Sequence, residues 1–359
     1  MASHNHTEID LLIHAKWIVP VVPAGTVLED HALAVSGRKI VDLLPGAEAD
    51  LRFQSKTTMR LSQHVLIPGL VNAHGHAPMS LLRGIADDMS LKQWLEQHIW
   101  PLEGKLVNEE FVQDGAELAI AEMIHAGTTC FADMYFFPDV VGQAAESCGL
   151  RAQLASPVLD FPTVWAADAD EYIRKATQLH DDFRNSELVT TAFGPHAPYT
   201  VSDEPIRKLA VLAEELEIPV HMHVHETAQE VADGLASTGV RPLARLNKLG
   251  MVNPNLVCVH ATQLDPSEID LLAQQAASVV HCPESNLKLA SGFCPVKLLQ
   301  QAGVNVALGT DGAASNNDLD LLSDLRTAAL LAKAVGGDAS AVPAHQALAM
   351  ATINGARAL

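Results

Sequence analysis

The sequence predicts an α/β fold, an eight-stranded parallel (β/α)8 barrel with a small β domain before it. Eight short apolar segments recur between residues 65 and 310, and each is followed by helix-like sequence. That alternation is the pattern of parallel strands joined by helices, and eight such units favour a closed barrel. The predicted strands are residues 65–73, 128–134, 151–158, 188–193, 219–225, 256–261, 277–282 and 304–310.

Helix signals separate these strands, most clearly in residues 108–125, 203–217 and 266–275. The last helix has the sharpest start, with Asp265 as the N-cap and Pro266 at the first helical position. An open doubly wound sheet is the rival fold, but it normally carries a glycine-rich turn after its first strand. No Gly-x-Gly-x-x-Gly motif stands there, so the barrel is favoured.

The small β domain is predicted to comprise residues 1–66, and the barrel is predicted to comprise residues 67–359. Residues 9–19 are strand-like, and the strand-like segments 31–35 and 39–44 flank a predicted hairpin turn at Ser36-Gly37-Arg38. The pattern indicates an antiparallel unit, which alone leaves an open edge and an uncovered face. The chain stops inside a helix-like segment, so we expect a C-terminal segment beyond Leu359 to complete a β-sandwich.

Charge and cysteine content restrict the partners and the compartment. The formal net charge of −20 disfavours nucleic acid or an anionic membrane as a partner. Residues 1–8 are polar and lack an apolar export segment, and no apolar run is long enough to cross a bilayer. The five cysteines form no Cys-x-x-Cys pair, and three lie in apolar runs typical of buried thiols. We therefore expect a cytoplasmic protein.

His74 and His76 are the first indication of a metal site. They follow an apolar strand, and side chains two residues apart project from the same face of a strand. Two imidazoles on one face supply half of a site for zinc or a similar ion. Because barrel active sites lie at the carboxyl ends of the strands, polar groups after other strands are candidates for the rest. These groups are His196, the segment 221–226, His260 and Asp311.

The fifth strand is ambiguous on geometry alone. His221, His223 and His225 share one face, so any of them could point into the barrel mouth, and at least one could be a packed core histidine. Glu226 has the opposite parity and reaches the mouth only if the chain has left the strand there.

Asp311 follows an apolar strand, where an unpaired carboxylate is expensive to bury, so a nearby cation is expected. A cap on the following Asp-Gly turn is the alternative. A single ion is favoured, because a bridged pair often uses a modified lysine on the fourth strand and residues 188–200 contain none. A second known zinc-site pattern, His-x-Glu with Pro-Cys-x-x-Cys, is also absent.

Eight short motifs are spread along the chain between residues 68 and 312. They are PGLVNAHGH at 68–76, LRGIADD at 82–88, WPLE at 100–103, GPHAPY at 194–199, HVHE at 223–226, VH at 259–260, HCPESN at 281–286 and GTDG at 309–312. Together they resemble the amidohydrolase superfamily. WPLE and GPHAPY extend the resemblance to the 5-methylthioadenosine/S-adenosylhomocysteine deaminase group.

The resemblance implies a ligand set that geometry left open. In this family the middle histidine of such a fifth strand is the ligand, which selects His223. One divalent metal ion per subunit, with zinc as the expected metal, would then be held by His74, His76, His223 and Asp311.

The resemblance also implies catalytic and substrate-binding roles. Glu226 would be the proton shuttle, His260 would orient the attacking water, and Asp311 would take part in catalysis. Glu226 and Asp311 would also contact the substrate. Glu103 would bind ribose hydroxyls, and His196 would touch the substrate close to its ring. Where several relatives have an arginine, this chain has Ala155-Ser156, which removes an expected anchor for a homocysteine carboxylate.

The expected reaction is hydrolytic deamination of 5'-methylthioadenosine to 5'-methylthioinosine and ammonia, with adenosine and S-adenosylhomocysteine as further candidate nucleoside substrates. One alternative is a related deaminase or chlorohydrolase that acts on guanine, an oxidised purine or a triazine. A non-catalytic metal-binding barrel is another, although such a protein would have no need of Glu226. The resemblance further implies a homo-oligomer, a dimer or larger.

Overall fold

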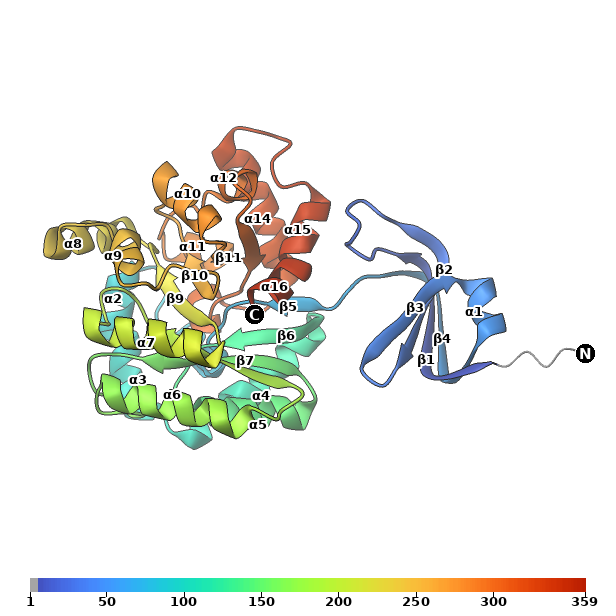
Figure 1. Ribbon diagram of the computed structural model, residues 1–359, viewed down its shortest axis with the longest axis horizontal. Coiled ribbons are helices and arrows are strands. Elements are labelled where there is room, and N and C mark those ends of the chain that lie inside the picture. The colour runs from blue at the N-terminus through green and yellow to red at the C-terminus, as the bar shows by residue number, and fades with distance from the viewer. Residues whose placement is uncertain (1–5) are drawn as a thin grey trace, which may run out of the picture. The chain divides into compact units, whose positions relative to one another are not determined.

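The computed structural model of the protein describes residues 6–359 and divides the chain into two compact units. One unit ends at Pro68, and the other spans Gly69–Leu359 (Figure 1).

The first unit is a four-stranded sheet with one short helix, α1 (Gly46–Arg52). Its strands are β1 (Thr7–Ile18), β2 (Leu28–Ser36), β3 (Lys39–Pro45) and β4 (Phe53–Leu66), in the order β3-β2-β1-β4. The predicted hairpin joins β2 and β3, and Gly37 adopts the left-handed conformation that its turn requires, with φ +57°. A small cluster that includes Leu12, Leu44 and Phe53 forms the core of this unit.

The three predicted strands pair antiparallel, as expected, and a fourth strand that was not predicted, β4, adds to β1 in parallel. Helix α1 carries the chain from β3 at one edge of the sheet to β4 at the other edge, so that β4 runs in the same direction as β3 and β1. Sequence patterns missed β4 because most of its side chains are exposed and polar, which removes the apolar alternation that marks a half-buried strand.

The second unit confirms the predicted barrel. Eight parallel strands follow one another in sequence order around the sheet: β5 (Leu70–Asn72), β6 (Thr128–Asp133), β7 (Arg151–Val158), β8 (Val189–Pro195), β9 (Val220–Val224), β10 (Leu256–His260), β11 (Ser278–His281) and β12 (Asn305–Leu308). The Ala73 N–H donates to the Leu308 carbonyl at 2.8 Å, so the first and last strands meet.

The first barrel strand is shorter than predicted. Val65 and Leu66 pair with Trp17 and Ile18 of β1, so they belong to the small sheet instead. A single apolar run in the sequence thus serves two different sheets.

Helices follow the strands around the barrel (Figure 1). The three helices predicted with the clearest limits are α4 (Glu109–His125), α7 (Asp203–Leu216) and α10 (Pro266–Gln274), and α10 has a complete capping box between Asp265 and Glu268. The others are α2 (Leu91–Trp94), α3 (Trp100–Leu106), α5 (Pro138–Cys148), α6 (Ala169–Phe183), α8 (Ala228–Thr238), α9 (Pro242–Lys248), α11 (Pro283–Lys288), α12 (Val296–Gln301), α13 (Ala313–Asn316), α14 (Leu321–Gly336), α15 (Ala344–Met350) and α16 (Ile353–Ala358).

Aliphatic side chains dominate the barrel core, with the fully buried rings of Phe131, Tyr172 and Phe193 among them. All five cysteines are free thiols. Within residues 6–359, no helix combines the length and the apolar character that a membrane span needs.

Candidate active site

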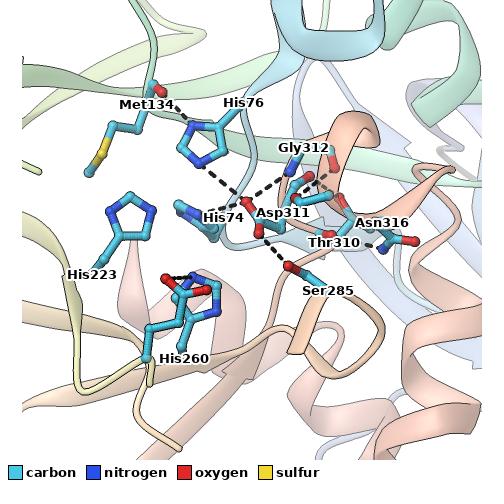
Figure 2. Close-up of polar contacts among 12 residues, drawn as sticks. His74, His76, Met134, His223, His260, Ser285, Thr310, Asp311, Gly312 and Asn316 are labelled. Carbon is cyan, nitrogen blue, oxygen red and sulfur yellow. Dashed lines mark hydrogen bonds and ion pairs between the residues drawn. The ribbon is translucent and has the colours of Figure 1, made fainter. Parts of the chain in front are cut away.

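Five side chains from the carboxyl ends of four barrel strands converge on one region (Figure 2). His74 and His76 follow β5, His223 lies in β9, His260 ends β10, and Asp311 follows β12. Their ligand atoms form two overlapping groups, and within each group these atoms lie within 4.8 Å of one another. The groups are His74 with His223 and His260, and His74 with His76 and Asp311. The four predicted metal ligands are therefore brought together, with His260 beside them.

Backbone carbonyls fix the ring orientation of two of these histidines. His76 Nδ1 lies 2.6 Å from the Met134 carbonyl oxygen, and His223 Nδ1 lies 2.7 Å from that of His196. Since a carbonyl only accepts, each Nδ1 carries the hydrogen, and each Nε2 of the neutral ring keeps a lone pair. That tautomer is the one a metal ligand needs.

His221 contacts His74 and does not line the pocket. Its Nε2 lies 2.9 Å from His74 Nδ1, and its ring is completely buried. His225 has turned away, and its Nε2 accepts the Leu243 N–H at 3.1 Å. The three histidines of the fifth strand thus have three different surroundings, which their shared parity could not reveal.

Asp311 lies against two of the predicted metal ligands and also caps the turn that follows it. Its Oδ1 lies 3.4 Å from His74 Nε2 and 3.2 Å from His76 Nε2, and it accepts the Gly312 N–H at 2.9 Å as a turn cap would. The Ser285 hydroxyl donates to Oδ2 at 2.6 Å. Burial alone would raise the pKa of this carboxyl, but the two histidines hold it well below its usual range.

The donor set fits a divalent metal ion. Burial lowers the pKa of His74 to about 4 and that of His223 well below the usual value, so both imidazoles are neutral and able to coordinate. Burial opposes protonation of His76 as well, but Asp311 raises the pKa of that ring to about 9. His74 Nε2 is buried and has no hydrogen-bond partner among the described residues. Imidazoles beside one carboxylate are ligands that zinc and related ions accept.

Glu226 and His260 lie next to this cluster. The Glu226 carboxyl accepts a hydrogen bond from the Ser291 hydroxyl at 3.2 Å, and its other oxygen lies 3.7 Å from His260 Nε2. His260 Nδ1 lies 2.9 Å from the Asn286 side-chain oxygen, which orients the ring. Burial raises the pKa of Glu226 above its ordinary value, so this carboxyl is suited to hold and deliver a proton.

A largely apolar pocket opens over these groups. Glu103 of α3 and His196, which follows β8, both line it together with His76, His223, Glu226, His260 and Asp311. Burial raises the pKa of Glu103 to about 7. His196 Nδ1 lies 3.0 Å from the Thr200 hydroxyl, which fixes the ring. Every predicted site residue therefore lies in or around one pocket.

A model of the amidohydrolase family matches residues 65–359. The chain is also 52% identical to a 5-methylthioadenosine/S-adenosylhomocysteine deaminase of Saccharophagus degradans, over 99% of its own length and 80% of the relative's. The chain belongs to the amidohydrolase family. Within this family it belongs to the group of those deaminases.

Solved structures resemble this amidohydrolase over nearly its whole length. An adenosine deaminase from Xanthomonas campestris, with bound zinc, is 56% identical, has a TM-score of 0.97, and covers 99% of this chain and 81% of its own. An atrazine chlorohydrolase from Arthrobacter aurescens TC1 has a TM-score of 0.89 at 24% identity, covering 97% of this chain and 83% of its own. The second likeness shows the shared fold alone.

Sequence reasoning missed several residues that support the site of this amidohydrolase. Ser285 and Asn286 contact Asp311 and His260, and both follow β11 at the carboxyl end of the barrel. The same strand-end signal that selected the histidines could have found them. Thr262 and Glu230 hold the backbone beside Glu226. Glu230 had a sequence signal of its own, because Thr227-x-x-Glu230 matches a capping box.

Proposed function

We propose that the protein hydrolytically deaminates 5'-methylthioadenosine to 5'-methylthioinosine and ammonia, with adenosine and S-adenosylhomocysteine as further substrates. The observation that carries the proposal is the arrangement of the proton donor and the metal ligands. Glu226 faces the same pocket as His76, His223 and Asp311, and the nucleoside-binding candidate Glu103 lines that pocket too. The relatives named as deaminases of adenine nucleosides support the same chemistry.

His74, His76, His223 and Asp311 are the residues proposed to hold one divalent metal ion per subunit, and zinc is the expected metal. The neutral imidazoles of His74 and His223 and the single buried carboxylate support this assignment, as does the zinc in the Xanthomonas relative. When bound, such an ion lowers the pKa of a water from about 16 toward 7 and makes hydroxide available at neutral pH.

The chain's own residues move the protons. Asp311 accepts the proton that the attacking water loses, and His260 orients that water by a hydrogen bond. Glu226 protonates the ring nitrogen next to the attacked carbon, which draws electrons out of the ring. The water oxygen bonds to the amino-bearing carbon as a hydroxyl, which gives its remaining proton to the Glu226 carboxylate as the carbon–oxygen double bond forms. Asp311 passes the proton that it accepted to the amino group, the carbon–nitrogen bond breaks, and ammonia leaves.

Glu103 and His196 are the proposed substrate contacts. A buried carboxylate suits the two hydroxyls of a ribose, because each of its oxygens can accept one hydrogen bond. Free bases and triazines have no such hydroxyls, so a buried Glu103 favours a nucleoside over guanine, an oxidised purine or a triazine. The cytoplasmic location, the homo-oligomer and the domain limits stay predictions from the sequence.

The test measures ammonia release from 5'-methylthioadenosine, adenosine, S-adenosylhomocysteine and guanine, together with metal analysis of the same sample. We expect release from the adenine nucleosides, no release from guanine, and about one zinc ion per subunit. Failure to release ammonia from any adenine nucleoside by the metal-loaded protein would overturn the proposal.

A further inference from the structure

The backbone leaves β9 through a sharp bend before it reaches Glu226. The strand ends at Val224, and His225 adopts the left-handed conformation with φ +55°, which is unfavourable for a residue that carries a side chain. In a straight strand Glu226 would point away from the face of His223. The bend turns Glu226 toward the same side as His223, and both residues line the pocket.

Glu230, on the first turn of α8, binds this bend directly. Its Oε1 accepts the His225 N–H at 2.9 Å, and its Oε2 accepts the Glu226 N–H at 2.7 Å. Glu230 is only 8% exposed. The two carboxylate oxygens thus each accept a hydrogen bond from one of two consecutive backbone N–H groups. The second N–H belongs to Glu226, the proposed proton donor.

This arrangement differs from an ordinary helix cap. Thr227 is the N-cap of α8, and its side chain accepts the Glu230 N–H at 3.1 Å. In a capping box the glutamate would return to the N–H of the N-cap residue. Here the Glu230 carboxylate interacts with the Thr227 N–H too, but its two hydrogen bonds go to the two residues before Thr227, so it holds the bend as well as the helix.

Thr262, which follows β10, forms hydrogen bonds to the carbonyl groups of the same two residues. Its N–H donates to the His225 carbonyl at 3.0 Å, and its hydroxyl donates to the Glu226 carbonyl at 2.7 Å. Every backbone donor and acceptor of His225 and Glu226 therefore has a partner, and those partners fix one conformation of the bend.

We propose that Glu230 is a positioning residue, which holds the left-handed bend at His225 and so directs the Glu226 carboxyl at the substrate. The assignment of Glu226 as the proton donor rests on the proposed function. Glu230 does not line the pocket, so its effect on catalysis is transmitted through the backbone of Glu226.

The test is Glu230→Gln, which keeps the size of the side chain but replaces one acceptor oxygen by an NH2 group that faces a backbone donor. We expect kcat for 5'-methylthioadenosine to fall roughly 10- to 100-fold, since a displacement of about 1 Å can cost that much. KM should change by less than about threefold, and the metal content should stay at the wild-type value, because the proposed ligands lie outside the bend.

Glu171→Gln is the matched control. Glu171 occupies the same position on α6, three residues after the N-cap Asp168, and its Oε2 accepts the Ala167 N–H at 2.8 Å. We expect kcat of this control to stay within about twofold of the wild-type value. Equal kcat in the two variants, or a loss of metal that matches the loss of activity in Glu230→Gln, would overturn the positioning role.

A second pair of variants covers the case in which Glu230→Gln does not fold. Thr262→Val removes the hydroxyl donor to the Glu226 carbonyl, and Thr262→Ser restores it. A fall in kcat with valine and recovery with serine, at constant metal content, is the expected result. Wild-type kcat in both would contradict the proposal.

The crystal structure of Glu230→Gln separates this proposal from the proposed function. If the wild-type protein releases no ammonia, the proposed function fails, and the positioning role is then judged on the conformation alone. A variant that keeps the left-handed His225 and the Glu226 carboxyl in the pocket would overturn it, whereas a relaxed bend would support it.

Discussion

Glu226 is the residue on which the proposed chemistry depends most directly. The residue is 5% exposed, and burial raises the pKa of its carboxyl, so it holds a proton at a pH where an exposed glutamate would not. Glu226→Gln keeps the shape but has no proton to give. We expect kcat to fall on the order of 100- to 10,000-fold with the metal content unchanged, measured by ammonia release and metal analysis. Near-normal turnover in this variant would refute the assigned role.

Glu103 gives the proposed reaction a pH dependence of defined sign. Its pKa of about 7 lies above the ordinary value of 4.5 because the carboxyl is buried. Above that pH the carboxylate accepts hydrogen bonds from ribose hydroxyls, and below it the protonated group loses part of that capacity. KM for 5'-methylthioadenosine should therefore rise roughly tenfold as the pH falls from about 8 to about 6.

Glu103→Gln is the control for that titration, because its amide does not ionise in this range. Its KM should be higher than that of the wild-type protein at pH 8 and nearly constant down to pH 6. The measurement is the pH profile of KM for both proteins, and a wild-type profile as flat as that of the variant would exclude Glu103 as the titrating group.

At the scale of elements, the contact between β5 and β12 closes the barrel and also sets the spacing of the proposed ligands. A Cβ placed on Gly309 would lie 2.8 Å from both the backbone N and the Cβ of His74. Gly309→Ala therefore has to push the two strands apart. We expect a loss of about 1–3 kcal/mol in the free energy of unfolding, together with weaker metal binding, measured by denaturation and by metal titration.

Gly75→Ala is the comparison for that variant. A Cβ on Gly75 meets its nearest atoms at 3.5 Å, an ordinary contact, although this glycine lies between two of the proposed ligands. Its stability should stay close to the wild-type value. A destabilisation as large as that of Gly309→Ala would show that crowding at the β5–β12 contact is not the cause.

The strands of the barrel could be predicted from the sequence, whereas the bend after β9 could not. The eight barrel strands and their order followed from apolar periodicity, because buried parallel strands are continuous apolar runs. The bend at His225 did not follow, since it depends on contacts with Glu230 and Thr262 that lie in other elements. For the same reason, family resemblance and not spacing selected His223 from three histidines of equal parity.

At the scale of the whole molecule, the proposed ligands come together only in the closed barrel. His74 and Asp311 are 237 positions apart in the chain, yet the Asp311 N–H donates to the His74 carbonyl at 3.1 Å. The chain's first and last barrel strands are therefore joined at the site itself. The same closure forms the pocket above it, whose walls decide which substituents a substrate can carry.

Within the part of the chain that the structure describes, those walls offer no lysine or arginine side chain to a charged substrate tail. The described residues that line the pocket include aromatic and aliphatic side chains such as Trp94, Trp100, Phe161 and Val164, but no lysine or arginine. Ala155 and Ser156 are fully buried in β7 and do not line the pocket. The apolar methylthio group of 5'-methylthioadenosine can be buried here favourably, whereas the homocysteine carboxylate would lose water without gaining a partner.

We therefore expect kcat/KM for S-adenosylhomocysteine to lie roughly 10- to 1,000-fold below that for 5'-methylthioadenosine, as the loss of a charge-assisted hydrogen bond would predict. Val164, which is 40% exposed at the pocket, is the place to test the cause. Val164→Arg should raise kcat/KM for S-adenosylhomocysteine without raising that for 5'-methylthioadenosine, while the uncharged Val164→Gln should not. Equal kcat/KM for the two nucleosides in the wild-type protein would mean that the homocysteine tail stays in solvent, and the apolar walls would then have no part in selectivity.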